Sequence, residues 1–217
     1  MNELPKSPLG EDELLAKRSR YKLLAIISVA LIPLLLATAM YYGQFALPKG
    51  KSNKGTLIWP PITLNSFAEV DAQHPENDLM KLVQKNKKWT LLVTGNSMCN
   101  DFCKESLHTV RQVNIALGKE ADRVSRLLIS SIEVEELKAI QQDYPNLIIE
   151  TAKATEIANF EHAAQNNGAK IETKESNQWM VWVVDPLGNV ILQYTHRHDG
   201  YDMIDDLKRV LKLSNIG

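Results

Sequence analysis

The pattern of hydrophobic and polar positions divides the chain into two regions. Residues 23–42, "LLAIISVALIPLLLATAMYY", are twenty positions without a charge, whereas residues 57–217 alternate short apolar runs with longer amphipathic stretches. A helix rises about 1.5 Å per residue, so a helix of this length covers roughly 30 Å, the thickness of the hydrocarbon core of a bilayer. The pattern therefore predicts one N-terminal transmembrane helix followed by one folded domain of ordinary size.

Two other interpretations of the apolar run stay open. A buried core helix is one, although a core helix is rarely so uniformly apolar. A cleaved signal peptide is the other, because Ala37, Thr38 and Ala39 form an A-x-A pattern that would allow cleavage after Ala39. The acidic residues at 11–13 and the length of the run favour an uncleaved anchor over a signal peptide.

The basic residues that flank the run indicate its orientation. Residues 17–22 hold four Lys or Arg residues, and residues 49–54 hold three Lys residues. This small excess favours an N-terminus in the cytoplasm and a folded domain outside it, which in a bacterium means the inner membrane and the periplasm. The predicted organisation is a cytoplasmic tail at 1–22, a transmembrane helix at 23–42, a linker at 43–56 and a folded domain at 57–217.

The apolar periodicity of the folded region alternates between strand and helix. The expected elements are an extended segment at 57–64, a buried strand at 89–94, a helix at 101–117, a strand at 126–132, a helix at 133–144, a short strand or turn at 146–150, a helix at 155–166, a hairpin at 179–184 and 190–194, and a helix at 202–213. The first two buried strands, joined by a helix, predict a parallel unit, and the hairpin predicts an antiparallel edge. This order predicts an α/β fold with a mixed sheet flanked by helices, which is the thioredoxin-like architecture.

Both cysteines of the chain lie in "TGNSMCNDFC", residues 94–103, where the first buried strand runs into a helix. Sites in open α/β sheets form at the carboxyl ends of the strands, where this motif lies. The N-terminus of a helix also favours the thiolate form of a cysteine over the thiol. Lys104 would act in the same direction and Asp101 would oppose it. The three-residue spacing allows Cys99 and Cys103 to form a redox pair, to bind one soft metal ion, or to be small buried residues or a structural disulfide.

Composition narrows the range of partners. The formal net charge is −1, and no basic stripe stands out apart from the short runs beside the apolar segment. The sequence therefore gives no reason to expect a nucleic acid partner. An oxidising compartment outside the cytoplasm permits a disulfide, so two neighbouring cysteines there are stronger candidates for a functional pair.

Several of these features resemble the Sco/SenC family, membrane-anchored thioredoxin-like proteins of copper delivery and cytochrome c oxidase assembly. The similarity includes the anchor, Cys99 and Cys103 as C-x-x-x-C, and "VWVVDPLGNVILQY" before a last helix. In that family the two cysteines and a histidine bind copper, with the histidine eight residues ahead of the aspartate of the DP turn. That position here is Asn177, and the prolines of the family's cysteine motif are also missing.

Other histidines are candidates for the missing ligand. His196 and His198 follow the last strand and form a spacing that can bind a metal, although loop histidines are usually solvated. His108, His74 and His162 are expected to point away from the cysteines or to lie on the surface. A thioredoxin-type oxidoreductase would also carry a cis-proline before the late strand, and residues 172–180 contain no proline.

Three hypotheses follow from the sequence. The first is a membrane-anchored, Sco-like factor that assists assembly of a respiratory oxidase, through thiol redox chemistry or a weak copper relay at Cys99 and Cys103. Its partners would be the membrane and an oxidase subunit or its assembly factors. The second is a membrane-tethered thiol–disulfide oxidoreductase with a wider range of clients. The third is a non-catalytic interaction module whose disulfide is structural.

Overall fold

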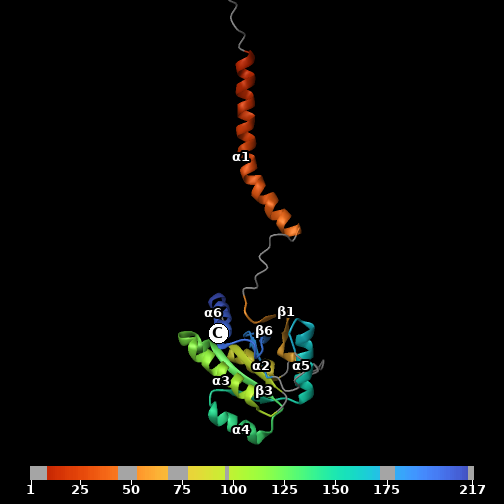
Figure 1. Cartoon of the computed structure of the whole chain (residues 1–217), viewed down its shortest axis with the longest axis vertical. Helices are drawn as coiled ribbons and strands as arrows, with labels where there is room; N and C mark the ends of the chain where they lie inside the picture. The colour runs from red at the N-terminus through yellow and green to blue at the C-terminus, as the bar shows by residue number, and fades with distance from the viewer. Residues whose placement is uncertain (1–8, 44–52, 68–77, 96–97, 172–178, 215–217) are drawn as a thin grey trace, which may run out of the picture. The chain divides into compact units, whose positions relative to one another are not determined.

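The computed structural model describes residues 9–43, 53–67, 78–95, 98–171 and 179–214. The chain separates into two compact units, residues 1–51 and residues 52–217. The first unit contains one long helix, and the second contains every described strand. Figure 1 shows the helix and strand labels used below.

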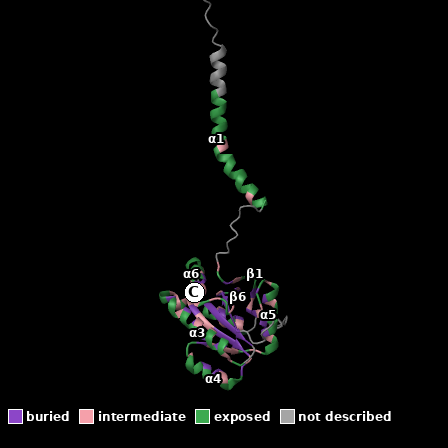
Figure 2. Cartoon of the chain, in the orientation of Figure 1, coloured by how far each residue is buried: buried purple, intermediate pink, exposed green. Residues whose placement is uncertain are grey.

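The first unit is the helix α1 (Leu9–Gly43), which contains the whole predicted transmembrane segment. Its stretch Arg18–Gly43 has a mean hydropathy of 2.6 and no buried residue, and Figure 2 colours most of it green, for exposed. A long helix whose apolar side chains are exposed suggests a membrane anchor. Pro33 lies inside this helix, a position that membrane helices tolerate better than soluble ones.

The second unit is a six-stranded mixed sheet with the strand order β1-β6-β5-β2-β3-β4. Strands β2, β3 and β4 are parallel to one another, and the pairs β2–β5, β5–β6 and β1–β6 are antiparallel. The strands are β1 (Thr56–Thr63), β2 (Trp89–Gly95), β3 (Val124–Ser130), β4 (Ile148–Thr151), β5 (Met180–Val184) and β6 (Asn189–Tyr194). The helices are α2 (Asp78–Asn86), α3 (Asp101–Ala116), α4 (Val134–Asp143), α5 (Ala154–Asn166) and α6 (Gly200–Leu213), with short 3-10 helices η1 (Leu64–Phe67) and η2 (Gly118–Arg123).

Two hydrophobic clusters cover the two faces of this sheet. One cluster joins the strands to α3, α4 and α6, and the other joins them to η1, α2 and α5. Figure 2 shows the strands as the buried centre of the domain. Strands β2 and β5 are buried at every position, because a strand covered on both faces has no solvent-facing side.

The described sheet confirms the predicted α/β fold and corrects two details of it. The hairpin β5–β6 does not form an edge, because β1 pairs with β6 and takes the outer position. The sequence interpretation expected an extended segment there but gave it no partner. Helix α2 was not predicted; it has only nine residues, and its buried side chains are Met80 and Val83.

A buried carboxylate fixes the beginning of the domain. Asp206 on α6 is 2% exposed, and it accepts hydrogen bonds from the backbone amides of Lys54 and Gly55 at 2.8 and 2.9 Å. The hydroxyl of Tyr194 donates to the same carboxylate at 2.9 Å. Three donors satisfy a carboxylate that would otherwise be costly to bury.

Candidate functional site: the Cys99–Cys103 disulfide

The cysteine motif lies where β2 ends and α3 begins, as predicted. Asn100 is the N-cap of α3, and its side-chain oxygen accepts a hydrogen bond from the backbone amide of Cys103 at 3.1 Å. This bond satisfies one of the amides that a helix leaves without a partner at its first turn. Cys103 therefore belongs to the first turn of the helix, whereas Cys99 precedes the cap.

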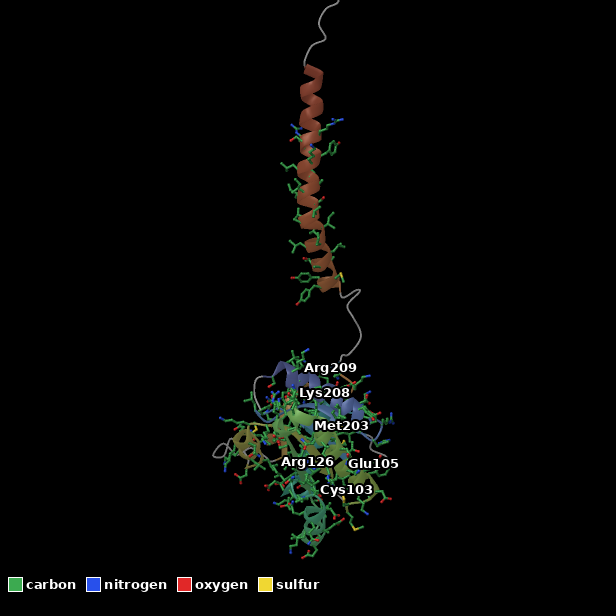
Figure 3. The ribbon with its side chains drawn as sticks, turned by 90° about the vertical axis from the view of Figure 1, so that its left-hand side faces the viewer. Cys103, Glu105, Arg126, Met203, Lys208 and Arg209 are labelled. Carbon is green, nitrogen blue, oxygen red and sulfur yellow. A yellow bond between two sulfur atoms is a disulfide. The ribbon has the colours of Figure 1, made fainter. Side chains whose placement is uncertain are left out.

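The structure brings Cys99 and Cys103 together as a disulfide, with their Cα atoms 5.0 Å apart. Cys103 is fully buried and belongs to the cluster beneath α3, whereas Cys99 is half-buried at its margin. Figure 3 labels Cys103 and Glu105 near the start of this helix. Cys103 has no exposed surface, so Cys99 is the cysteine of the pair that contributes exposed surface.

A carboxylate from another helix contacts the exposed side of the motif. The backbone amide of Cys99 donates a hydrogen bond to Oε1 of Glu136 at 2.8 Å. Glu136 lies in the first turn of α4, which follows β3, the parallel neighbour of β2. Carboxyl ends of adjacent parallel strands open at the same edge, so the segments that follow β2 and β3 meet there. The sequence interpretation missed Glu136, although the acidic residues directly after the second buried strand were a usable signal.

An indole ring supports the end of β2 from behind the motif. A Cβ atom at Gly95 would lie 2.5 Å from the ring of Trp179, so only glycine allows this close approach. Trp179 is itself 4% exposed and belongs to the same cluster as Cys103. The last residue of β2 before the motif is thus held between the sheet and a buried ring.

Aromatic and polar side chains surround a small cavity beside the first turns of α3. Phe102, between the two cysteines, is 43% exposed, and its ring centroid lies 6.2 Å from that of His196. The cavity lies between the first turns of α3 and the segment that follows β6. Its lining includes Phe102, Ser106, Thr109, Trp179, His196 and His198.

The histidines considered as candidates for the missing metal ligand lie in different parts of the domain. His198 is half-buried, and its Nδ1 accepts a hydrogen bond from the backbone amide of Thr195 at 3.1 Å. His108 faces a groove between α3 and α6, and His162 is exposed on α5. His74 lies outside the described residues.

The copper expectation rests on the two cysteines alone in the part of the chain that the structure describes. Within that part, no three His, Cys, Asp or Glu side chains are grouped as metal ligands. Asn177, at the position of the family's histidine, lies outside the described residues. A soft metal needs thiolates, and both sulfurs are bonded to each other here. In this oxidised form the described residues offer no group of metal ligands, and Cys99 and Cys103 could bind a soft metal only after reduction to thiolates.

Burial raises one pKa close to the site. Desolvation and the nearby Asp206 carboxylate raise the pKa of Tyr194, whose side chain also lines the cavity. The phenol therefore stays neutral and donates a hydrogen bond to Asp206. Tyr194 is therefore a buried group that joins β6 to α6.

Comparison with protein families gives two matches along the chain. Residues 89–214 match the family described as transmembrane-like, thioredoxin-like, C-terminal domain. The chain belongs to this family. Residues 16–44 match its companion, described as the transmembrane-like N-terminal domain. These matches confirm the thioredoxin-like fold, and the second agrees with an apolar helix that suggests an anchor.

Solved structures similar to the domain include Sco proteins and thiol–disulfide oxidoreductases. Arabidopsis thaliana ScoI with copper bound is 19% identical, with 60% of this chain and 89% of that chain covered and a TM-score of 0.47. BsSco, a member of the Sco family of cytochrome c oxidase assembly proteins, is 18% identical over 75% and 98%, with a TM-score of 0.46. A thiol:disulfide interchange protein from Bacteroides sp. is 16% identical over 75% and 93%, with a TM-score of 0.42.

No curated protein matches the chain. The solved structures include the family that the sequence resembles. At these identities and TM-scores, however, they carry nothing about what this chain binds or transfers.

Proposed function

We propose that the chain is a membrane-anchored thiol–disulfide exchange protein that uses Cys99 and Cys103 as its redox pair. The observation that carries this proposal is the disulfide at the carboxyl end of β2. One of its cysteines is half-buried and the other is fully buried. Such a pair offers one sulfur to a client and protects the other. The proposed setting is the inner membrane of a bacterium, with the N-terminus in the cytoplasm and the domain in the periplasm.

The exchange step balances with a client dithiol as the reductant. A client thiolate attacks the Cys99 sulfur, the Cys99–Cys103 bond breaks, and Cys103 leaves as a thiolate that takes up a proton. The second client thiol then loses its proton and attacks the client sulfur of the mixed disulfide, and Cys99 leaves as a thiolate that is protonated in turn. Two electrons pass from the client to the cysteine pair, which ends as two thiols, while the client ends as a disulfide; the reverse sequence reduces a client disulfide.

The proposed client is a cysteine pair of a respiratory oxidase or of one of its assembly factors. Support for this client is the sequence resemblance to the Sco/SenC family. A weak copper relay remains the second form of this proposal and needs the reduced pair. Titration of the reduced chain with Cu(I) tests it, with Cys99→Ser and Cys103→Ser variants as controls. Tight stoichiometric binding that both variants lose supports the relay, and its absence contradicts it.

Trapping of a mixed disulfide tests the exchange role. In a Cys103→Ser variant the Cys99 thiolate attacks a client disulfide and releases one client sulfur as a thiolate. Because Cys103 is missing, it cannot attack the resulting mixed disulfide, so the client should remain bound through a bond that reductant cleaves. The Cys99→Ser variant, whose remaining sulfur is fully buried, should trap nothing. A reduction potential well below about −300 mV would instead indicate a structural disulfide. Full oxidase activity in cells that carry the double serine variant would contradict the proposed oxidase client.

A further inference from the structure

Glu136 brings a negative charge to the sulfur pair from outside the motif. Its carboxylate accepts the amide hydrogen of Cys99 itself, and covalent geometry keeps the Cys99 sulfur within a few ångströms of its own amide nitrogen. Glu136 is half-buried, so water screens this charge less than it screens a fully exposed one. The first turn of α4 also favours a carboxylate, because the helix dipole is positive at that end.

The other charged groups beside the motif do not make this contact. Asp101 and Lys104, on the first turn of α3, are exposed and carry opposite charges. Glu133 and Glu135, at the start of α4, are also exposed. Glu105 on α3 is exposed as well. Because solvent screens these five charges more than it screens Glu136, Glu136 is the least screened charge beside Cys99.

The carboxylate acts on every partner that approaches Cys99. Thiolate–disulfide exchange spreads a negative charge over the reacting sulfurs, and a like charge nearby disfavours it. A positive charge next to the client's cysteine offsets this repulsion, because it lies close to the carboxylate when the two sulfurs meet. Glu136 therefore discriminates between partners by the charge that they carry next to the reacting sulfur.

We propose that Glu136 is a specificity-determining residue that selects clients whose reacting cysteine is flanked by Lys or Arg and rejects those flanked by Asp or Glu. This inference rests on the proposed exchange function and names the class of client for it. Glu136 neither gives nor takes electrons in the reaction. It also positions the segment before α3 through the Cys99 amide.

Charged thiol reagents measure this selectivity without any client. The full-length chain in detergent, reduced and carrying Cys103→Ser, is reacted with two methanethiosulfonates, one with a trimethylammonium group and one with a sulfonate. The ratio of the two rates reports the potential at Cys99, because the ionised fraction of the thiol affects both rates equally. We expect Cys99 to prefer the cationic reagent more than a free cysteine peptide does.

The substitution Glu136→Gln removes the charge and keeps an oxygen that accepts the Cys99 amide hydrogen. With the dielectric of water, a unit charge about 6 Å from the charged group of each reagent changes the ratio of the two rates about tenfold, because it acts on the two reagents with opposite sign. We expect Glu136→Gln to lower the ratio by about that factor. Glu135→Gln changes the net charge equally but lacks the contact, so it should change the ratio less than threefold.

Two results would overturn the proposal. One is an unchanged ratio in Glu136→Gln, and the other is an equal change in both glutamine variants. The rate with an uncharged methanethiosulfonate measures access to Cys99 alone. A change in this rate identifies a variant that has lost its fold, so that loss of folding is not mistaken for loss of selectivity. These reagents test Glu136 even if no client is trapped, so failure of the exchange function and failure of this inference remain distinguishable.

Discussion

Reduction of the disulfide should leave the domain folded, because the bond closes a very short loop. Cys99 and Cys103 are four positions apart, and the loss of chain entropy grows with the logarithm of loop length. For a loop of about five residues the chain-entropy relation gives about 2 kcal/mol. A natural domain has roughly 5–15 kcal/mol of stability, so the reduced form keeps most of it. The thiol of Cys103 also packs as a small apolar group in the cluster that already holds it.

Urea unfolding of the oxidised and reduced domain, residues 52–217, measures this difference directly. We expect the free energy of unfolding to fall by about 2 kcal/mol, which for a domain of this size lowers the melting temperature by about 4–8 °C. The Cys99→Ser variant provides a control that cannot reoxidise within the chain. A loss above about 4 kcal/mol, or unfolding on reduction, would refute the reasoning and would favour a structural disulfide over an exchanging one.

Three further predictions concern buried polar groups of the domain. Thr94→Val leaves the indole N–H of Trp182, which now donates to the Thr94 hydroxyl at 2.8 Å, without its acceptor and should cost about 1–3 kcal/mol in urea unfolding. Asp206→Ala removes the acceptor of the Lys54 amide and should speed proteolytic cleavage near that residue, whereas an unchanged cleavage rate would contradict the anchoring role. Burial raises the pKa of Glu161 from 4.5 to about 7, so the folded state holds this proton more tightly and stability should fall as the pH rises from about 4.5 to about 7. Glu161→Gln should remove that fall, giving a variant more stable than the parent at pH 8 and similar to it at pH 4, as thermal unfolding at the two pH values would show.

The sequence was most informative where periodicity and burial agree. Strand β2 reads as an unbroken apolar run because helices cover both of its faces, and α3 carries its apolar residues at helical spacing. The hairpin was recognisable from the turn that begins at Asp185. The Asp185 carboxylate accepts hydrogen bonds from the backbone amides of Leu187 and Asn189, which fixes this turn. These signals are local, so a single sequence contains them.

Features that depend on pairing between distant segments were harder to predict. The position of β1 beside β6 follows from the sheet order, which no local pattern specifies. Helix α2 is too short for its two buried residues to define a period. The contact between Glu136 and Cys99 joins residues 37 positions apart, and it becomes visible only once β2 and β3 are known to be parallel neighbours.

The position of Cys99 changes how the three-residue spacing should be understood. The spacing alone allows both sulfurs to lie on one side of the first helical turn, but Cys99 precedes the N-cap Asn100 and only Cys103 is in the helix. The amide of Asn100 donates to the carbonyl of Met98, which turns the chain back toward the helix and brings the two cysteines together. Cys103 is held by the cap and by the core, whereas Cys99 is held by a hydrogen bond to another helix. Exchange at this pair therefore depends on α4 as well as on the motif, and substitution of Glu136 should alter the reactivity of Cys99 without touching either sulfur.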